Sequence, residues 1–351
     1  MVSILVTGGS GFIGSHTCLT LLENGYKIYV VDNFENSSPK ALERVQEILL
    51  ANNLQVSNKL KIFNFDIRNE SRLGDVFCDA ENSGYPITAV IHFAGLKAVD
   101  ESVDNPLLYW DVNVNGAITL LKVMELNNCK TMVFSSSATV YGLAGDKPLV
   151  ERSQISPINP YGSTKVAIEN LFNDIFNKNK NDWRIANLRY FNPIGAHSSG
   201  LIGENPTGRA NNIFPIILDV AVSKNKLFKI FGNEWPTPDG TGVRDYIHVV
   251  DLAEGHLKTL EYLQRNAPQI LNLNLGTGIG TSVLDLINSF EKVNNIKIPY
   301  VFSASRKGDA SSVIADNKFA KRILDWSPNR TVEDACLDGW KWRSLNINGY
   351  D

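Results

Sequence analysis

Short runs of apolar residues, many of them β-branched, alternate with longer segments of helical periodicity along the first half of the chain. The short runs are apolar on both faces, which is typical of strands buried inside a parallel sheet. The segments between them are long enough for crossover helices, so the pattern predicts an α/β fold with a doubly wound parallel sheet. The predicted strands are Ile4–Thr7, Ile28–Val31, Lys61–Phe65, Ala89–His92, Met132–Ser135 and Ile185–Arg189.

The helical segments carry apolar residues on one face, and Gly25 provides a C-terminal stop for the first of them. After Arg189 the regularity drops and Gly, Pro, Ser and Asn accumulate, which indicates a boundary between two lobes. We predict one lobe over residues 1–190 and a smaller, mixed α/β lobe over 191–351, with parts near 245–275 returning to the first lobe. The predicted helices are Phe12–Asn24, Ser38–Leu50, Leu107–Leu126, Thr164–Lys178, Asn212–Val222, Val250–Leu263, Val283–Val293 and Lys318–Leu324, with a loop at Asn233–Gly242.

Composition and charge exclude several classes of protein. The chain has 351 residues, 43% of them hydrophobic and 20% charged, which is ordinary for a globular enzyme of two lobes. The net charge of -3 and the lack of a basic block argue against a nucleic-acid partner. The first apolar run, Ile4–Val6, is too short for a signal peptide or a membrane span, so we expect a cytoplasmic protein with no membrane partner.

Cysteine and histidine form no recognisable metal or disulfide pattern. The four cysteines occur singly, as expected for reduced thiols. None of the five histidines has the spacing to Cys or Glu that a metal site requires. We therefore expect neither a disulfide framework nor a metal.

A glycine-rich segment leaves the first predicted strand and enters the first predicted helix, with glycines at Gly8, Gly11 and Gly14. This context is typical of a dinucleotide site, because glycine permits a tight turn and lets a pyrophosphate approach the start of the helix. Asp32 ends the second strand and offers a carboxylate to the adenine ribose, where it would repel the extra phosphate of NADP. We therefore predict NAD as the cofactor. Asp66 after the third strand is either an adenine contact or a turn residue.

Tyr161 and Lys165 lie four residues apart, so on a helix they would share one face. A tyrosine has a pKa of ~10, and its use as a base near neutral pH requires a decrease of about 3 units, or ~4 kcal/mol. An ammonium at ~4 Å in an effective dielectric of ~20 contributes about that amount. Ser137, beyond a predicted strand, could relay a proton to Tyr161. Without a catalytic role, Tyr161 would be a tyrosine in a loop, Lys165 a solvated charge on a helix and Ser137 a turn residue.

Two arginines stand beside glycines in the second half of the chain, Arg244 and Arg306. Arginines in such surroundings often bind phosphate groups. Surface salt bridges are an equally good interpretation of either residue.

These motifs, in this order, resemble those of the extended short-chain dehydrogenases/reductases, and within that family most closely those of the UDP-galactose 4-epimerases. The resemblance extends over nearly the whole chain. It rests on GGSGFIGSHT from Gly8, HFAGLKAV from His92, FSSSATVYG from Phe134, LRYFNPIGAH from Leu188 and DGTGVRDYIHV from Asp239.

The resemblance implies a Rossmann lobe for NAD and a smaller lobe for a UDP-sugar, with Ser137, Tyr161 and Lys165 as catalytic residues. The implied cofactor contacts are Gly8, Gly11, Phe12, Ile13, Gly14, Asp32, Asn33, Asp66, Ile67, Phe93, Ala94, Lys97, Asn113, Tyr161, Lys165 and Tyr190. The implied substrate contacts are Lys97, Ser137, Thr139, Asn192, Asn212, Phe231, Arg244, Tyr246, Arg306, Asp309 and Val313.

The implied reaction is 4-epimerisation of UDP-galactose and UDP-glucose by removal and return of a hydride through a 4-keto sugar. Family members usually form homodimers through helices that correspond to Leu107–Leu126 and Thr164–Lys178. Val313 matches a sugar-pocket position that is a large aromatic residue in strict enzymes and very small in enzymes for N-acetyl sugars, so we expect intermediate breadth.

Several alternatives stay open. A 4,6-dehydratase usually has an Asp-Glu pair after the strand-end serine, whereas Ala138 and Thr139 stand here, so water elimination has no evident acid or base. An epimerase for UDP-N-acetylglucosamine or for both kinds of sugar, a uronate epimerase and an oxidoreductase that releases NADH are further candidates. A non-catalytic NAD-binding scaffold would not need Tyr161, Lys165 and Ser137 together.

Overall fold

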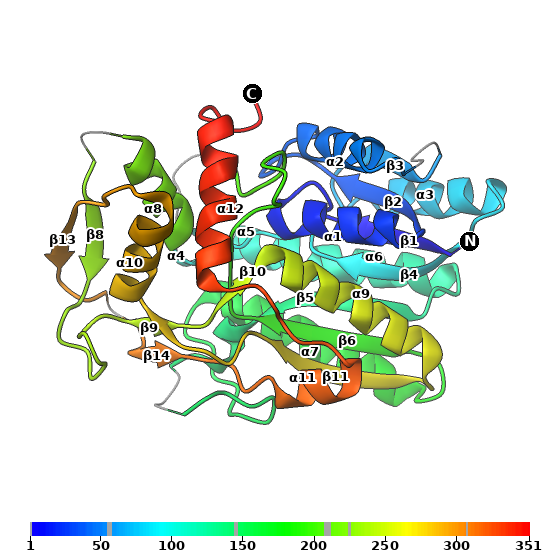
Figure 1. Cartoon of the computed structure of the whole chain (residues 1–351). Coiled ribbons are helices and arrows are strands. Elements are labelled where there is room, and N and C mark those ends of the chain that lie inside the picture. Colours follow the sequence, from blue (N-terminus) through cyan, green and yellow to red (C-terminus); the bar gives the residue numbers. More distant parts are fainter. Residues whose placement is uncertain (1, 55–57, 144–146, 207–211, 224–225, 307) are drawn as a thin grey trace.

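The computed structural model describes residues 2–54, 58–143, 147–206, 212–223, 226–306 and 308–351 (Figure 1). Its centre is a parallel sheet with the strand order β11-β6-β5-β4-β1-β2-β3. The predicted doubly wound sheet is thereby confirmed. The strands are β1 Ser3–Thr7, β2 Lys27–Asp32, β3 Leu60–Asn64, β4 Ile87–His92, β5 Thr131–Ser137, β6 Arg184–Tyr190 and β11 Gln269–Leu275.

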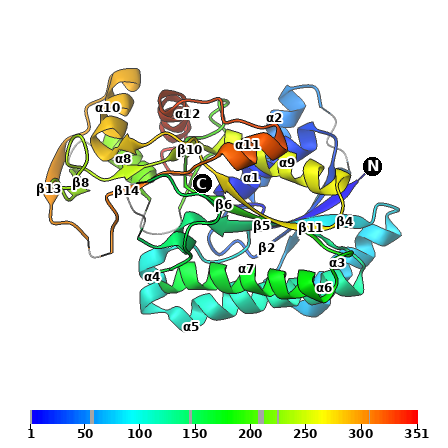
Figure 2. The ribbon, with the colours of Figure 1, turned by 90° about the horizontal axis from the view of Figure 1, so that it is seen from below.

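Helices cover both faces of this sheet, as Figure 2 shows. Alternate residues of each strand point to opposite faces, so that Ile4 and Val6 pack into one core and Leu5 into the other. This arrangement explains why the strands are apolar on both faces. The helices of the first face are α1 Phe12–Glu23, α2 Lys40–Ala51, α9 Val249–Arg265 and α11 Lys318–Leu324, and those of the second are α3 Glu70–Asn82, α6 Gly116–Leu126 and α7 Pro160–Lys178.

The remaining elements lie beyond the carboxyl ends of the strands and beside α7. Two short helices and a π-helical turn precede α6, and a short 3-10 turn follows β5. They are α4 Val99–Asp104, α5 Pro106–Tyr109, η1 Trp110–Asn115 and η2 Ala138–Tyr141. The elements at the left of Figure 1, which we call the small-sheet region, are β8 Phe228–Phe231, β9 Val243–Arg244, β12 Thr281–Ser282, β13 Tyr300–Ser303, β14 Ser312–Val313, α8 Ile213–Val222 and α10 Val283–Asn294.

The small-sheet region is connected to the large sheet by a parallel pair, β7 Asn192–Ile194 and β10 Tyr246–His248, and by the C-terminal helix α12 Val332–Leu345. α12 packs against α8, α10 and β10. Residues 249–275 then return to the large sheet as α9 and β11.

Two predicted helices differ from the observed ones in ways that affect the site. The segment predicted as one helix, Leu107–Leu126, is divided into α5, η1 and α6. The helix predicted from Thr164 begins four residues earlier, at Pro160, because the side chain of Asn159 caps it by accepting a hydrogen bond from Gly162 N at 2.8 Å. Helices α3 and α12 and strand β11 were not predicted.

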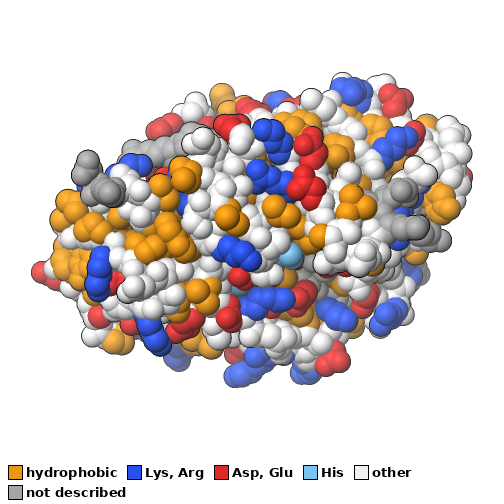
Figure 3. Space-filling model, turned by 45° about the horizontal axis from the view of Figure 1, so that its top comes forward, with side chains coloured by type: hydrophobic (Ala, Val, Ile, Leu, Met, Phe, Trp, Pro, Cys, Tyr) orange, Lys and Arg blue, Asp and Glu red, His pale blue; other side chains and the backbone are white. Residues whose placement is uncertain are grey.

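The surface in Figure 3 carries interspersed charges of both signs, and hydrophobic side chains gather at the left, over β8, β13, α8 and α10. The four cysteines are free, and only Cys78 is exposed. Within the described ranges, no helix combines the length and the apolar character that crossing a bilayer would need. The same ranges contain no group of three or more His, Cys, Asp or Glu side chains arranged to hold a metal.

Candidate active site

The turn between β1 and α1 is built on glycines. Gly8 has φ +69°, and a Cβ atom there would stand 2.6 Å from the backbone N of Ala94 at the end of β4. A Cβ on Gly14 would overlap the Gly8 carbonyl, so helix α1 meets the turn too closely for any side chain. The predicted tight turn is therefore present, and it brings the ends of β1 and β4 together.

Helix α1 presents its N-terminus at this turn. Gly11 occupies the N-cap position and has no side chain that could satisfy the first N–H groups of the helix. Phe12, Ile13 and Gly14 form the first turn. Free N–H groups and the positive end of the helix dipole make this place suitable for an anionic group.

Asp32 lies at the end of β2 next to the same turn. Its Oδ2 accepts a hydrogen bond from Ser10 N at 2.9 Å, and its Oδ1 accepts from Phe34 N and Ser37 Oγ at 3.0 and 2.9 Å. The side chain is buried, and its carboxylate fixes the turn while keeping a further lone pair of Oδ2 available. The neighbouring Asn33 is exposed and accepts from Glu35 N.

Asp66 and Ile67 follow β3. The carboxylate of Asp66 accepts hydrogen bonds from Arg68 N, Nε and Nη2 at 2.9, 2.9 and 2.6 Å. These bonds with Arg68 lower the pKa of Asp66. Asp66 thus has the turn role that the sequence offered, while its contact with adenine stays a prediction, and Ile67 lies buried in the core.

The loop after β4 carries Phe93, Ala94 and Lys97. The N–H groups of Phe93 and Ala94 both donate to Thr7 O, at 2.9 and 3.1 Å, which ties the loop to the end of β1. Asn113 holds the other side of this loop: its Oδ1 accepts from Leu96 N at 2.8 Å, and its Nδ2 donates to Leu96 O.

Asn113 also reaches α7, because its Nδ2 lies 3.1 Å from Thr164 Oγ1. It is buried and belongs to the π-helical turn η1. A π turn inserts one residue into a helix and is frequent at functional sites. Here the extra residue brings an amide into the space between the β4 loop and the first turn of α7.

Ser137, Tyr161 and Lys165 come together at the carboxyl end of β5. Tyr161 and Lys165 are one turn apart on α7, and a hydrogen bond joins Ser137 and the Tyr161 side chain. The Ser137 hydroxyl in turn accepts from Thr139 N and Oγ1 at 3.2 and 3.0 Å. Lys165 Nζ donates to Ser135 O at 2.8 Å, so the lysine binds the strand that carries the serine.

The expected lowering of the Tyr161 pKa by Lys165 is not what this arrangement gives. Lys165 Nζ lies 5.6 Å from the centroid of the Tyr161 ring and is bound to Ser135. Burial raises the pKa of Tyr161, and the hydrogen bond with Ser137 acts in the opposite direction. Burial also lowers the pKa of Lys165 to about 8, against the effect of the Glu169 carboxylate. The effect expected from an ammonium at ~4 Å leaves out the cost of burying a phenolate, and this cost raises the pKa of Tyr161.

A buried network that the sequence did not reveal supports these residues. Glu169, one further turn along α7, accepts from Ser136 Oγ at 2.5 Å and from Arg189 Nε and Nη2 at 3.0 and 2.6 Å. Arg189 on β6 also donates to Tyr141 OH. Glu169 and Arg189 are both almost fully buried. The run Tyr161, Lys165, Glu169, at helical spacing, was the available signal.

Tyr190 ends β6 and is buried, and its hydroxyl is hydrogen-bonded to His256 Nε2 and to Ser135. These contacts connect the end of β6 to β5 and to α9.

The predicted substrate residues fall into neighbouring groups. Arg306 stacks over the Phe231 ring, with the guanidinium carbon 3.8 Å from the ring centroid. Arg244 pairs with Asp309, and it is opposite Val313 in the β9–β14 pair. Arg244 therefore makes a salt bridge, which was one of the two interpretations of this residue from the sequence.

Val313 connects these groups to the catalytic strand. It is half-buried and packs against a buried cluster that includes Val140, three residues after Ser137, and Phe191, which precedes Asn192. Substrate and catalytic residues that are far apart in the sequence are therefore adjacent in space.

Asp245 holds this part of the chain together. Its carboxylate accepts from Thr277 N and Oγ1, Gly278 N and Ala315 N at 2.8, 2.6, 2.9 and 3.2 Å. Its backbone carbonyl accepts from Asn192 N at 3.0 Å. It is fully buried, and it sits between Arg244 and Tyr246, so it fixes the direction of both.

Asn212 and Lys97 both contact Glu204, which no sequence motif indicated. Asn212 Nδ2 and Lys97 Nζ both donate to Oε1 of Glu204, at 2.9 and 3.1 Å.

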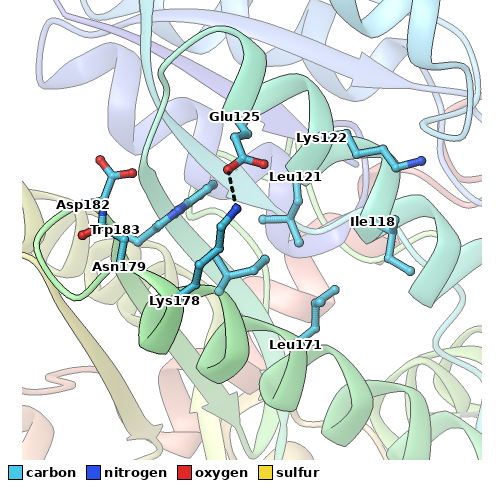
Figure 4. A pocket seen from close by; sticks show the side chains of 10 residues that line it. Ile118, Leu121, Lys122, Glu125, Leu171, Lys178, Asn179, Asp182 and Trp183 are labelled. Carbon is cyan, nitrogen blue, oxygen red and sulfur yellow. Dashed lines mark ion pairs between the residues drawn. The ribbon is translucent and has the colours of Figure 1, made fainter.

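A groove of about 370 Å³ lies elsewhere, between α6 and the C-terminal half of α7 (Figure 4). Ile118, Leu121 and Leu171 line it, and the Lys178–Glu125 ion pair of 3.6 Å crosses it. It is on the outer surface of the helices, while Tyr161 is in the first turn of α7.

Comparison with known proteins gives a consistent result. The sequence model of the family described as GDP-mannose 4,6 dehydratase matches residues 5–338. A UDP-glucose 4-epimerase of Bacillus subtilis (strain 168) is 48% identical over 349 residues, which is 99% of each chain.

Solved structures agree over the same length. A UDP-glucose-4-epimerase from Stenotrophomonas maltophila, with bound NAD and formylated UDP-arabinopyranose, has a TM-score of 0.92 at 40% identity and covers 99% of both chains. A UDP-glucose 4-epimerase from Bifidobacterium longum, in complex with NAD+ and UDP, has a TM-score of 0.90 at 42% identity and covers 99% of this chain and 100% of that one.

Proposed function

The chain belongs to the UDP-glucose 4-epimerase family, and we propose on that premise that it interconverts UDP-galactose and UDP-glucose with NAD as its cofactor. The observation that carries the proposal is the meeting of Ser137, Tyr161 and Lys165 beside a glycine turn at the carboxyl edge of the sheet. Open α/β sheets bind their ligands at this edge.

The residues at the edge fit a dinucleotide. Gly8 and Gly14 leave no room for side chains, so a pyrophosphate could approach the N-terminus of α1. Asp32 would bind the adenine ribose through the remaining lone pair of Oδ2, and Lys165 would bind the nicotinamide ribose. The chemistry that NAD supplies when bound is reversible hydride transfer at C4 of the sugar, so the oxidised form is restored in each turnover.

Proton transfer is the part of the reaction that falls to this chain. Ser137 is hydrogen-bonded to Tyr161, so it would pass the proton of the sugar 4-hydroxyl to an ionised phenol and later return it. Burial raises the pKa of Tyr161, so ionisation depends on positive charge nearby. Lys165 provides one such charge, and it also holds the carbonyl of Ser135 next to the relay.

The UDP-sugar would occupy the space in front of this group. Arg244 and Arg306 would bind its diphosphate, and Phe231 would offer a flat apolar face. The β7–β10 pair places Asn192 opposite Tyr246, and Asp309 pairs with Arg244.

A 4,6-dehydratase fits the site less well, although the matching family model is named after one. Such an enzyme needs an additional acid and base near the sugar. Ala138 offers none, and the Thr139 hydroxyl is bound to Ser137 at 3.0 Å.

The second candidate is an enzyme that also accepts UDP-N-acetylglucosamine. It is favoured by Val313, whose half-buried, medium-sized side chain leaves more room than an aromatic ring would at the same place. Comparing kcat/KM for UDP-N-acetylglucosamine and UDP-glucose tests this, and no turnover of the acetylated sugar would contradict it.

We further propose a cytoplasmic homodimer. Apolar side chains are exposed along α5, η1 and the end of α6, among them Leu107 at 85%, Trp110 at 44% and Leu126 at 79%. Together with the groove of Figure 4 they form an apolar surface that a second copy would cover. The four unpaired cysteines suit a reducing compartment.

The decisive experiment is incubation of the purified protein with UDP-galactose without added NAD. Formation of UDP-glucose is expected, because an epimerase that restores its cofactor retains it. Steady accumulation of NADH after NAD is added would instead indicate an oxidoreductase, and no product even with NAD would refute the proposal.

A further inference from the structure

Glu204 joins two predicted binding residues that come from distant parts of the chain. Its Oε1 accepts from Lys97 Nζ at 3.1 Å and from Asn212 Nδ2 at 2.9 Å. Lys97 belongs to the loop after β4, whereas Asn212 stands at the N-cap of α8. Asn212 makes no capping hydrogen bond to its own helix, since its amide is turned to Glu204.

The backbone of Glu204 is fixed from the opposite side by the end of the chain. Its carbonyl accepts from Trp342 Nε1 of α12 at 3.2 Å. The preceding residue, Gly203, is bound through both backbone groups to Tyr350 OH, at 3.2 and 3.1 Å. Trp342 and Tyr350 are buried. The carboxylate is therefore held in one position by packed elements.

Stability alone does not account for a carboxylate at this place. Oε2 of Glu204 is buried and has no hydrogen-bond partner in the described part of the chain, which costs about 1–3 kcal/mol. The gain from Lys97 is small, because its side chain is 61% exposed and such pairs contribute about 0–1 kcal/mol. What the carboxylate does provide is a fixed position for the Lys97 ammonium and for the Asn212 amide.

We propose that Glu204 is a positioning residue that orients Lys97 and Asn212 toward the UDP-sugar. The inference rests on the proposed function, because it names a further determinant of the same substrate site. Glu204 fixes the spacing between a positive group on the large sheet and a polar group at the small-sheet region. Without it, both side chains must lose their conformational freedom when the substrate binds, which weakens binding.

Two variants test the proposal. Glu204→Ala removes both contacts, and KM for UDP-galactose is expected to rise about tenfold, as ordering of two side chains requires, while kcat changes by less than about twofold. Glu204→Gln keeps an acceptor for Asn212 and loses the charge, so a smaller rise is expected. The thermal midpoint should hardly change, and Glu204→Gln preserves the test if the alanine variant is poorly folded.

Glu291 offers a matched control, because it also pairs with a lysine, Lys297 at 2.5 Å, within the small-sheet region. Glu291→Gln is expected to leave KM unchanged. In the background K97M/N212A, adding Glu204→Ala should have no further effect on KM.

An unaltered KM in both Glu204 variants would overturn the inference. So would a rise in KM on adding Glu204→Ala to K97M/N212A that is as large as the rise in the otherwise wild-type protein. So would a fall in kcat alone. A wild-type protein that does not epimerise UDP-galactose contradicts the proposed function instead, so the two failures are distinguishable.

Discussion

At the scale of single residues, the reactive centre depends on charge inside a desolvated site. Burial disfavours both the Tyr161 phenolate and the Lys165 ammonium, so it raises the pKa of the first and lowers that of the second. Ser137 connects to the phenol, and Ser135 accepts from the ammonium. A further positive charge close to the phenol would favour its ionised form.

Replacement of Tyr161 by phenylalanine removes the proposed proton acceptor and little else. Its hydroxyl is bonded to Ser137, so the fold should persist while kcat falls by a factor of about 10²–10⁴. Steady-state kinetics and retention of NAD, measured by absorbance after gel filtration, check this. Tyr300→Phe, at an exposed position of β13, is the control and should leave kcat unaltered. Normal turnover of Tyr161→Phe would exclude the proposed role.

The pKa of Lys165 leads to a dependence on pH. Since burial lowers this pKa to about 8, the ammonium is complete below that value and is lost as pH rises through it. We expect kcat/KM for UDP-galactose to decrease on the alkaline side of about pH 8. The measurement is the pH profile of kcat/KM. A flat profile up to the usual lysine pKa of ~10.4 would show that the charge of Lys165 is not needed.

At the scale of elements, helix α7 and strand β5 act as one unit. Asn159 starts the helix early enough to include Tyr161, and the π-helical turn η1 brings Asn113 against Thr164. Glu169 links the helix to Ser136 on β5 and to Arg189 on β6. The position of the phenol is therefore set by elements that are far apart in sequence.

The Glu169–Arg189 pair allows a comparison between breaking and replacing a buried ion pair. Glu169→Gln leaves the Arg189 guanidinium buried without its counter-charge, and the free energy of unfolding is expected to fall by about 3–5 kcal/mol. The double variant E169M/R189M removes both charges and should lose less. Denaturant titration of both proteins checks this, and equal losses would mean that packing, not charge, dominates.

At the scale of the whole molecule, an apolar surface lies on the helices beside α7, and these helices run along the lower edge of Figure 2. It lies on the opposite face of the sheet from α1 and α9. A second copy bound there would leave the carboxyl edge of the sheet, and hence the proposed site, accessible.

Leu107→Glu should dissociate the proposed homodimer, because it places a charge at an 85% exposed apolar position of this surface. Light scattering coupled to gel filtration is the measurement. Leu50→Glu, at a 63% exposed position on α2, is the matched control and should not change the mass. A wild-type protein that is monomeric at all concentrations would contradict the assembly.

The sequence was sufficient for what depends on local pattern. Runs of apolar residues on both faces determine the seven-stranded sheet in all strands but β11, and Gly8 and Gly14 of the first turn have no substitute with a side chain. The spacing of Tyr161 and Lys165 likewise follows from helix geometry alone.

Only the tertiary structure decided what depends on neighbours far along the chain. Glu169, Asp245 and Glu204 carry no local signature, because their role comes from partners on other elements. The pKa of Tyr161 also depends on burial, which spacing cannot express. Periodicity is a property of adjacent residues, whereas desolvation and charge pairing arise when distant segments pack, and the reactive centre of this protein depends on both.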